Sequence, residues 1–171
     1  MASPLLAALA TLAIAGLVLV SAFFSSSEIA IFSLSEAWLA AEPPGADRRH
    51  GVLRTLRGDP HRLLVTILVG NNVVNVAIAS LVTALAIDVL PAGVAVTVAT
   101  VVASVVVLVF GEIVPKSYGL GHANSWALRV ARPIALIQRV SAPLVIAFDL
   151  LTRRLSAAVG GDTEIEAARL E

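Results

Sequence analysis

The chain has 171 residues, of which 58% are hydrophobic and 14% charged, with a mean hydropathy of +0.91 and no net charge. A soluble domain carries about a quarter charged residues, so much of this chain must face something other than water. The neutral balance, without a basic stripe, excludes a nucleic-acid-binding surface, and the lack of cysteine excludes disulfides and thiolate metal sites.

Three long apolar stretches predict membrane-spanning helices, since a span needs about 20 apolar residues. Pro4 suits the first turn of the first helix, which is expected to continue past Glu28. The Gly58-Asp59-Pro60 turn is expected to begin the second helix. The N-terminus lacks the positive segment of a signal peptide. The spans are placed at about residues 5–34, 62–88 and 92–112.

The distribution of positive charge predicts the topology. The segment before the second span is rich in arginine, so the positive-inside rule places it in the cytoplasm. The connection Asp88–Gly93 has no Lys or Arg and is expected outside, whereas the chain after Lys116 is again basic. We expect a multi-pass protein of the cell (plasma) membrane with its N-terminus outside and its C-terminus in the cytoplasm.

Amphipathic segments flank the spans. Interfacial helices are expected at about residues 36–57 and 124–155, with apolar faces in lipid and arginines among headgroups. A tilted fourth span over 124–155 is the alternative, although Arg139 would then sit awkwardly. Residues 1–155 thus form one transmembrane domain. Residues 156–171 are interpreted as the start of an acidic cytoplasmic helical region of a longer protein.

Polar side chains interrupt the first two spans. Ser21, Ser25 and Glu28 share one helical face, and two further serines widen this strip. The motif Gly70-Asn71-Asn72-Val73-Val74-Asn75 places three amides in an apolar span. An unpartnered amide in hydrocarbon costs several kcal/mol, so these groups must face protein, water or an ion. Helix packing through small and polar residues is the alternative.

A third motif, Gly111-Glu112-Ile113-Val114-Pro115-Lys116, ends the third predicted span. Proline has no N–H, so Pro115 cannot donate to the carbonyl of Gly111. The broken turn is expected to expose an oxygen ligand beside a carboxylate. The alternative is a plain helix end in which Glu112 pairs with Lys116.

The three motifs share the inner half of the bilayer, although residue counting does not place them at one depth. Their donors are all oxygens, which suit Mg²⁺, Ca²⁺ or Na⁺ rather than Zn²⁺ or Cu. The three histidines are scattered and are interpreted as solvated. No nucleophile–base pair can be assembled, so an enzyme is not expected.

At these three motifs the sequence resembles the CorC/CNNM family of Mg²⁺ transport proteins. The resemblance implies a homodimer with a juxtamembrane helical belt and an inward-facing cavity that holds a largely dehydrated Mg²⁺. Full-length members continue into CBS domains. The implied ligands are Ser21, Ser25, Asn71, Asn75, the Gly111 carbonyl and Glu112, and the cavity would also include Ser26, Ser27, Glu28, Asn72, Pro115 and Lys116.

The leading hypothesis is therefore an all-α, dimeric membrane protein with three transmembrane helices and interfacial amphipathic helices. It would transport Mg²⁺, in the export direction, by alternating access, with Na⁺ as the candidate coupling ion. Two alternatives remain: a membrane anchor or sensor for a cytoplasmic regulatory domain, and a cation channel, against which the apolar outer halves of the helices argue.

Overall fold

The computed structural model describes residues 3–41, 48–144 and 146–147. Its elements are all helical: α1 (Pro4–Phe32), α2 (Glu36–Ala40), α3 (Arg48–Arg57), α4 (Pro60–Val89), α5 (Ala92–Val106), the π-helical segment η1 (Val107–Ile113), α6 (Val114–Gly121) and α7 (Ala123–Val140). Over the described residues the fold is all-α, as predicted.

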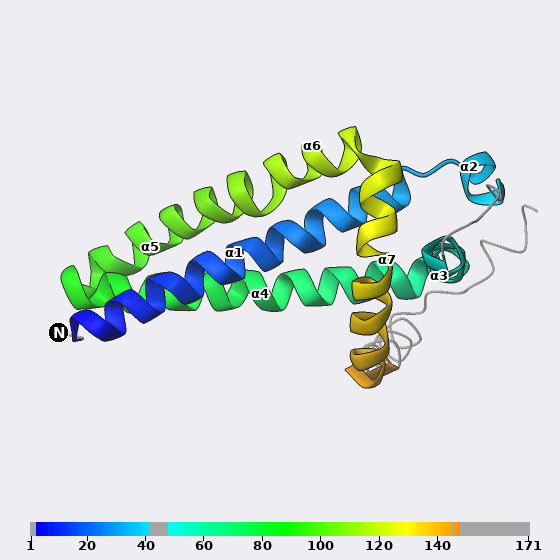
Figure 1. Cartoon of the computed structure of the whole chain (residues 1–171). Helices are drawn as coiled ribbons and strands as arrows, with labels where there is room; N and C mark the ends of the chain where they lie inside the picture. Colours follow the sequence, from blue (N-terminus) through cyan, green and yellow to red (C-terminus); the bar gives the residue numbers. More distant parts are fainter. Residues whose placement is uncertain (1–2, 42–47, 145, 148–171) are drawn as a thin grey trace, which may run out of the picture.

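Three helices are long and apolar enough to cross a membrane, namely Pro4–Phe32, Pro60–Val89 and Gly93–Gly121. They run alongside one another, and the third comprises α5, η1 and α6 in succession (Figure 1). The first two begin as the sequence predicts. Ser3 accepts a hydrogen bond from the Leu6 amide ahead of Pro4, and Asp59 accepts one from the Arg62 amide ahead of Pro60. The prediction of three spans is confirmed.

At one end of the spans α4 turns directly into α5, and the N-terminus of α1 lies at this same end (Figure 1). We call it the hairpin end. Ala95, Ala99 and Ala103 are buried at every fourth position of α5, which packs against α4. Such small residues let helix backbones approach closely in lipid.

The opposite end, here called the arginine-rich end, holds α2, α3 and α7. α7 runs across the spans rather than along them (Figure 1). Its buried face, which includes Val130 and Ile134, joins a core with Leu53 of α3, Ile31 of α1 and Leu63 of α4. The opposite face exposes three arginines, Arg129, Arg132 and Arg139. In the described part of the chain α7 is not among the candidate spans, which favours the interfacial interpretation.

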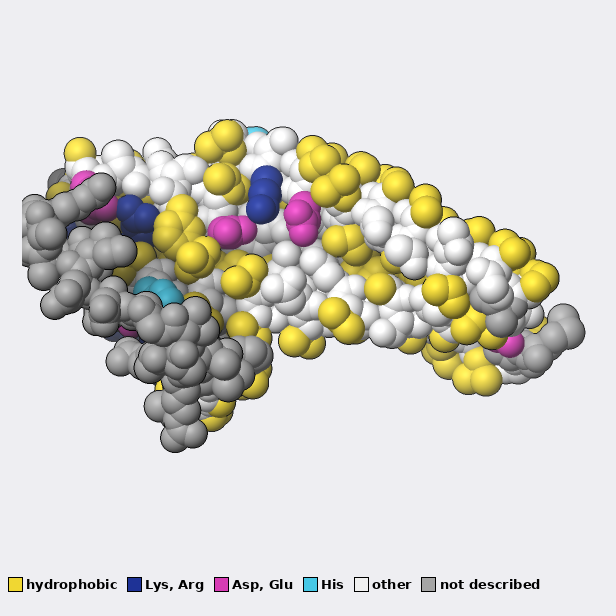
Figure 2. Space-filling model, turned by 180° about the vertical axis from the view of Figure 1, so that it is seen from behind, with side chains coloured by type: hydrophobic (Ala, Val, Ile, Leu, Met, Phe, Trp, Pro, Cys, Tyr) yellow, Lys and Arg dark blue, Asp and Glu magenta, His cyan; other side chains and the backbone are white. Residues whose placement is uncertain are grey.

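Much of the spans' surface is apolar, with large exposed side chains such as Leu5, Leu12, Val76 and Val101. Figure 2 shows hydrophobic side chains along the elongated part of one face, and a small group of acidic and basic side chains midway along it. A water-soluble protein rarely exposes so continuous an apolar surface. This exterior suits contact with lipid.

Several helix bounds differ from the approximate ones predicted. The first span, placed at about 5–34, ends at Phe32. The region predicted at about 36–57 contains two helices, α2 and α3, on either side of a segment that lies outside the described residues. In the region predicted at about 124–155, α7 spans Ala123–Val140, and residues 145 and 148–155 lie outside the described residues. The acidic region predicted at 156–171 also lies outside the described residues.

The largest boundary error concerns the third span, which was predicted to end at 112 but continues to Gly121. Pro115 was expected to break the helix, because a proline ring clashes with the carbonyl four residues earlier. Instead, η1 precedes α6 without interruption. The wider turn of a π-helix makes room for the ring, so the helix accommodates Pro115 and continues.

Candidate cation site

The centre of the candidate site lies between α1 and α4. The hydroxyl oxygen of Ser21 is 3.0 Å from Oδ1 of Asn71 and 2.9 Å from Oδ1 of Asn75. Ser21 is fully buried, and the two amides are half-buried, one helical turn apart. The structure therefore brings together the central residues of the first two motifs.

The number of protons at this centre is smaller than the number of acceptors. The Ser21 hydroxyl is within hydrogen-bonding distance of two amide oxygens, yet a hydroxyl carries one proton. One linear hydrogen bond can form, and the second amide oxygen then faces a lone pair. Three oxygens with one proton form an electron-rich cluster, which a cation would stabilise.

The third motif approaches the same cluster through Gly111. This residue is buried, and a Cβ atom added to it would lie 2.7 Å from the Ser21 hydroxyl oxygen. Real Cβ atoms essentially never make so short a contact. An alanine here would displace the Ser21 hydroxyl, so glycine lets the backbone of η1 lie against Ser21 without disturbing that hydroxyl.

The junction of η1 and α6 lacks one backbone donor. The Val114 amide donates to the carbonyl of Val109, five residues earlier. The next residue, Pro115, has no N–H. In the π-helical pattern an N–H at position 115 would have donated to the carbonyl of Phe110, five residues earlier. In the α-helical pattern it would have donated to the carbonyl of Gly111, four residues earlier. The turn beside Ser21 is thus short of a donor for its carbonyl oxygens, in keeping with the oxygen ligand expected from Gly111.

Two further serines of the first motif have buried hydroxyls. Within the described structure Ser25 and Ser27 have side-chain oxygens without a hydrogen-bond partner. Buried polar atoms are normally satisfied by protein or water. Ser25 lies one turn from Ser21 toward the arginine-rich end, so its oxygen extends the polar strip in that direction.

The charged residues of the motifs do not form the Glu112–Lys116 pair that a plain helix end would contain. Lys116 Nζ lies 3.5 Å from Glu28 Oε2, so Lys116 pairs with the first motif rather than with Glu112. Glu112 is half-buried and, within the described part of the chain, has no hydrogen bond or ion pair. It follows Gly111 directly in η1, at the level of the cluster along the third span.

Asn72 was predicted to line the cavity or its surroundings, and in the structure its side chain is exposed on α4. Successive residues of an α-helix are rotated by about 100°. Asn71 and Asn75 therefore share a face, and Asn72 lies at the edge of this face, turned toward the exposed side of α4.

The depth mismatch expected from the sequence also disappears. Ser21, Asn71 and Gly111 each lie about ten residues, or roughly 15 Å, from the arginine-rich end of their helix. The sequence estimate counted the first and third motifs from the outer ends of their helices and the second from its inner end, but the three helices, of 29, 30 and 29 residues, are longer than a bilayer requires. With the observed ends, the three motifs lie at one level.

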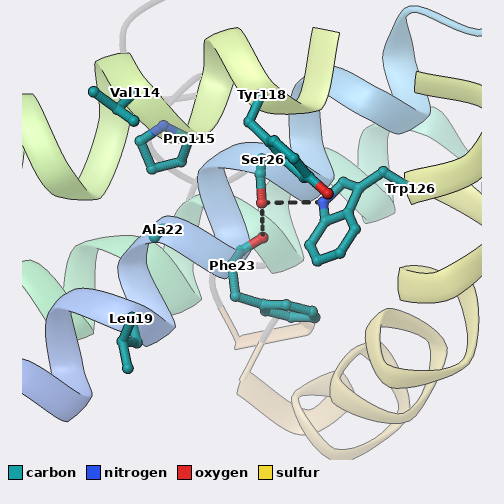
Figure 3. A pocket seen from close by; sticks show the side chains of 8 residues that line it. All are labelled: Leu19, Ala22, Phe23, Ser26, Val114, Pro115, Tyr118 and Trp126. Atoms are coloured by element: carbon teal, nitrogen blue, oxygen red, sulfur yellow. Dashed lines mark hydrogen bonds between the residues drawn. The ribbon is translucent and has the colours of Figure 1, made fainter. Parts of the chain in front are cut away.

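An apolar groove of about 420 Å³ lies next to the site, between α1, α6 and α7. Figure 3 shows the indole of Trp126 and the ring of Tyr118 on one side and Phe23 on the other. The Trp126 indole N–H donates to the Ser26 hydroxyl over 3.1 Å, and that hydroxyl donates to the Phe23 carbonyl over 3.2 Å. Ser26 therefore fastens α7 to α1, a role that the sequence did not reveal.

Within the described residues, no three His, Cys, Asp or Glu side chains gather to hold a metal ion. The donors at the site are hydroxyl, amide and backbone oxygens with one neighbouring carboxylate. This set fits a hard cation and does not fit a soft or borderline metal.

These features define a multi-pass helical membrane domain with a buried oxygen cluster between its three spans. The chain belongs to the CNNM family: the family model described as the Cyclin M transmembrane N-terminal domain matches residues 12–170. The predicted family membership is confirmed.

Relatives are found in plants and bacteria. A DUF21 domain-containing chloroplast protein of Arabidopsis thaliana is 40% identical over 125 residues, covering 72% of this chain and 19% of its own length. The UPF0053 inner membrane protein YfjD of Escherichia coli is 33% identical over 147 residues, covering 85% of this chain and 34% of its own length. The chain thus spans about a fifth of the length of the first relative and about a third of the length of the second.

Proposed function

We propose that the chain is the transmembrane module of a Mg²⁺ transporter and that the cation binds at the Ser21–Asn71–Asn75 cluster. The carrying observation is the convergence of two amide oxygens on one buried hydroxyl. A bound cation would accept all three oxygens as ligands and remove the shortage of protons. The buried Ser25 hydroxyl and the Gly111 carbonyl complete the proposed ligand set.

The choice of Mg²⁺ rests on the donor set and on the family. Oxygen ligands and a small negative charge suit Mg²⁺, Ca²⁺ or Na⁺. Mg²⁺ demands a compact octahedral arrangement at about 2.0–2.1 Å, and the close approach of Gly111 to Ser21 narrows the site. Glu112 supplies charge without forming an acidic cage, so the ion can also be released, as transport requires.

The proposed orientation follows the positive charge. Arg48, Arg49, Arg54 and Arg57 lie on α3, and the exposed arginines of α7 lie at the same end of the spans. The positive-inside rule then places the arginine-rich end in the cytoplasm and the hairpin end outside. We propose export by alternating access with Na⁺ as the coupling ion, and a cytoplasmic CBS-type domain in the full-length protein.

Calorimetry on the purified protein tests the site. Mg²⁺ binding is expected to weaken by about tenfold or more in Ser21→Ala and in Glu112→Gln, because the first loses the central oxygen and the second the nearby charge. Ca²⁺ and Na⁺ serve as competitors, and flux into proteoliposomes carrying a Mg²⁺-sensitive dye should fall in parallel.

The matched control is Ser80→Ala. Ser80 lies on α4, is exposed, and donates a hydrogen bond to the Val76 carbonyl of its own helix at 2.8 Å. It should bind Mg²⁺ like the wild type. Equal Mg²⁺ affinity in Ser80→Ala and Ser21→Ala would contradict the assignment of the site to Ser21. A folded wild-type protein that binds no Mg²⁺ would favour the membrane-anchor function.

We also propose that the domain is a homodimer, supported by the exposed amide of Asn72. This amide lies in the membrane-spanning part of α4, next to the exposed Val73 and Val76. A lipid-facing amide is costly, and a second copy packed against this face would cover it.

The dimer is tested by measuring mass in detergent with light scattering. Asn72→Trp is expected to shift the protein from dimer to monomer, because the bulky ring would separate the two copies. Leu12→Trp, at an exposed position of α1, is the control and should remain dimeric. A monomeric wild type, or two variants with unchanged dimer content, would contradict the proposed interface.

A further inference from the structure

A second polar feature lies beyond the candidate site, toward the hairpin end. A cleft of about 210 Å³ separates α4 from the α5–η1 helix. Its polar lining consists of Asn75, Thr83, Thr100 and Ser104, and small or apolar side chains form the rest. We call it the threonine cleft.

The threonine cleft starts at the cation site. Asn75 lines it and is also one of the two amides bonded to Ser21. Along α4 the lining residues recur every four positions, at Asn75, Ala79 and Thr83, which form one stripe on the helix. Thr100 and Ser104 form the matching stripe on α5. Both stripes run from the site toward the hairpin end.

The threonine hydroxyls present acceptors to the cleft. Thr83 Oγ1 donates its proton to the Ala79 carbonyl at 2.7 Å, and Thr100 Oγ1 donates to the Val96 carbonyl at 2.8 Å. Each hydroxyl has two acceptor lone pairs besides its single proton. With the protons engaged on their own helices, these oxygens can accept from water or coordinate a cation.

Packing alone does not account for this arrangement. A helix contact built for stability fills the space between its helices, yet a space lined in part by Ala79 and Ala103 remains open beside the packed contact of α4 and α5. The volume corresponds to about seven waters at roughly 30 Å³ each. That is close to the space of a Mg²⁺ ion with the six ligands of an octahedral shell.

We propose that the threonine cleft is the passage between the cation site and the hairpin end, along which the ion exchanges protein oxygens for water. This inference rests on the proposed transport function. Asn75 is then shared between the site and the passage, and Ser104, Thr100 and Thr83 are successive oxygens along the way. The passage replaces the uniformly apolar outer half that the sequence suggested.

Thiol labelling tests the passage, because the chain has no cysteine of its own. The single variants Thr100→Cys and Ser104→Cys are placed in proteoliposomes with a membrane-impermeant, charged methanethiosulfonate. The controls are Val101→Cys and Val105→Cys, whose parent side chains are exposed on the same helix but do not line the cleft. Thiolates form in water and not in lipid, so the cleft positions should react about tenfold faster or more.

A second variant separates the passage from the site. Ser104→Leu fills the cleft and is expected to lower Mg²⁺ flux by about tenfold or more while the Kd for Mg²⁺ at the site stays unchanged. Thr11→Leu, at an exposed position of α1 outside the cleft, should keep full flux.

The outcomes are distinguishable. Equal labelling at cleft and control positions overturns the passage, whatever the flux. Fast labelling with full flux in Ser104→Leu shows a wet cleft that ions do not use and also overturns it. Fast labelling in a protein that neither binds nor moves Mg²⁺ overturns the transport function, and with it the passage, while leaving the wet cleft as an observation.

Discussion

Gly111→Ala is expected to weaken Mg²⁺ binding by about tenfold or more. The new methyl group would lie 2.7 Å from the Ser21 hydroxyl oxygen, so either η1 or the serine must move. Ser21 cannot then keep its contacts to Asn71 and Asn75 at 3.0 and 2.9 Å. Calorimetry measures the affinity, and size-exclusion chromatography shows that the variant is folded.

Gly16→Ala is the matched control, because a Cβ atom at Gly16 meets nothing within 4 Å. In a helix interior alanine is favoured over glycine by about 0.5–1 kcal/mol, so this variant should be at least as stable and bind normally. The double variant Ser21→Ala/Gly111→Ala provides a second check. The clash with the Ser21 hydroxyl should also lower the stability of Gly111→Ala relative to the wild type. With the hydroxyl gone, the nearest atom to the added Cβ on residue 21 is its Cβ, at 3.4 Å, so this loss of stability should largely vanish.

Non-additivity of this kind shows that two residues share a contact. If Gly111→Ala bound Mg²⁺ like the wild type, the third span would have no part in the site. If its stability penalty were the same with and without Ser21, the penalty would come from the helix itself.

Gly119→Ala is expected to lower the melting temperature by about 5–10 °C. Gly119 is buried where α6 packs on α1. An added Cβ would overlap the backbone carbonyl of Ser26 and lie 2.7 Å from Cγ2 of Ile29. Backbone atoms cannot move aside as a flexible side chain can, so the two helices must separate.

The control, Gly121→Ala, lies on the same helix and meets nothing within 4 Å. It should melt with the wild type in a thermal-shift assay. Equal melting of the two variants would show that α6 does not pack closely on α1. Separation of α6 from α1 in Gly119→Ala would also disturb the hydrogen bond between Trp126 and Ser26. Tryptophan fluorescence should therefore change in that variant alone.

The two glycines indicate how the third span is held. Gly111 lets η1 approach the oxygen cluster. About two turns further on, Gly119 lets α6 approach the backbone carbonyl of Ser26 on α1. The span is thus pressed against α1 on both sides of Pro115. A π-helical segment between these contacts is the kind of irregularity found at functional sites.

The sequence alone was sufficient for the spans and for the motifs. Length and hydropathy are local properties set by the thickness of a bilayer, and helix caps such as Ser3 and Asp59 act on their immediate neighbours. Membership of the CNNM family also followed from three short motifs, each readable without a partner. The family resemblance carried by these motifs then placed Ser21, Asn71, Asn75 and Gly111 in one candidate site before any contact was known.

Only the tertiary structure decided how these residues meet. The π-helical turn that accommodates Pro115 moved the end of the third span, and Asn72 turned out to lie on an exposed face of α4. The Ser26–Trp126 bond joins residues 100 positions apart, and the threonine cleft needs two helices at a set distance. Such features depend on which faces pack together, and packing is a property of pairs of helices that no single segment encodes.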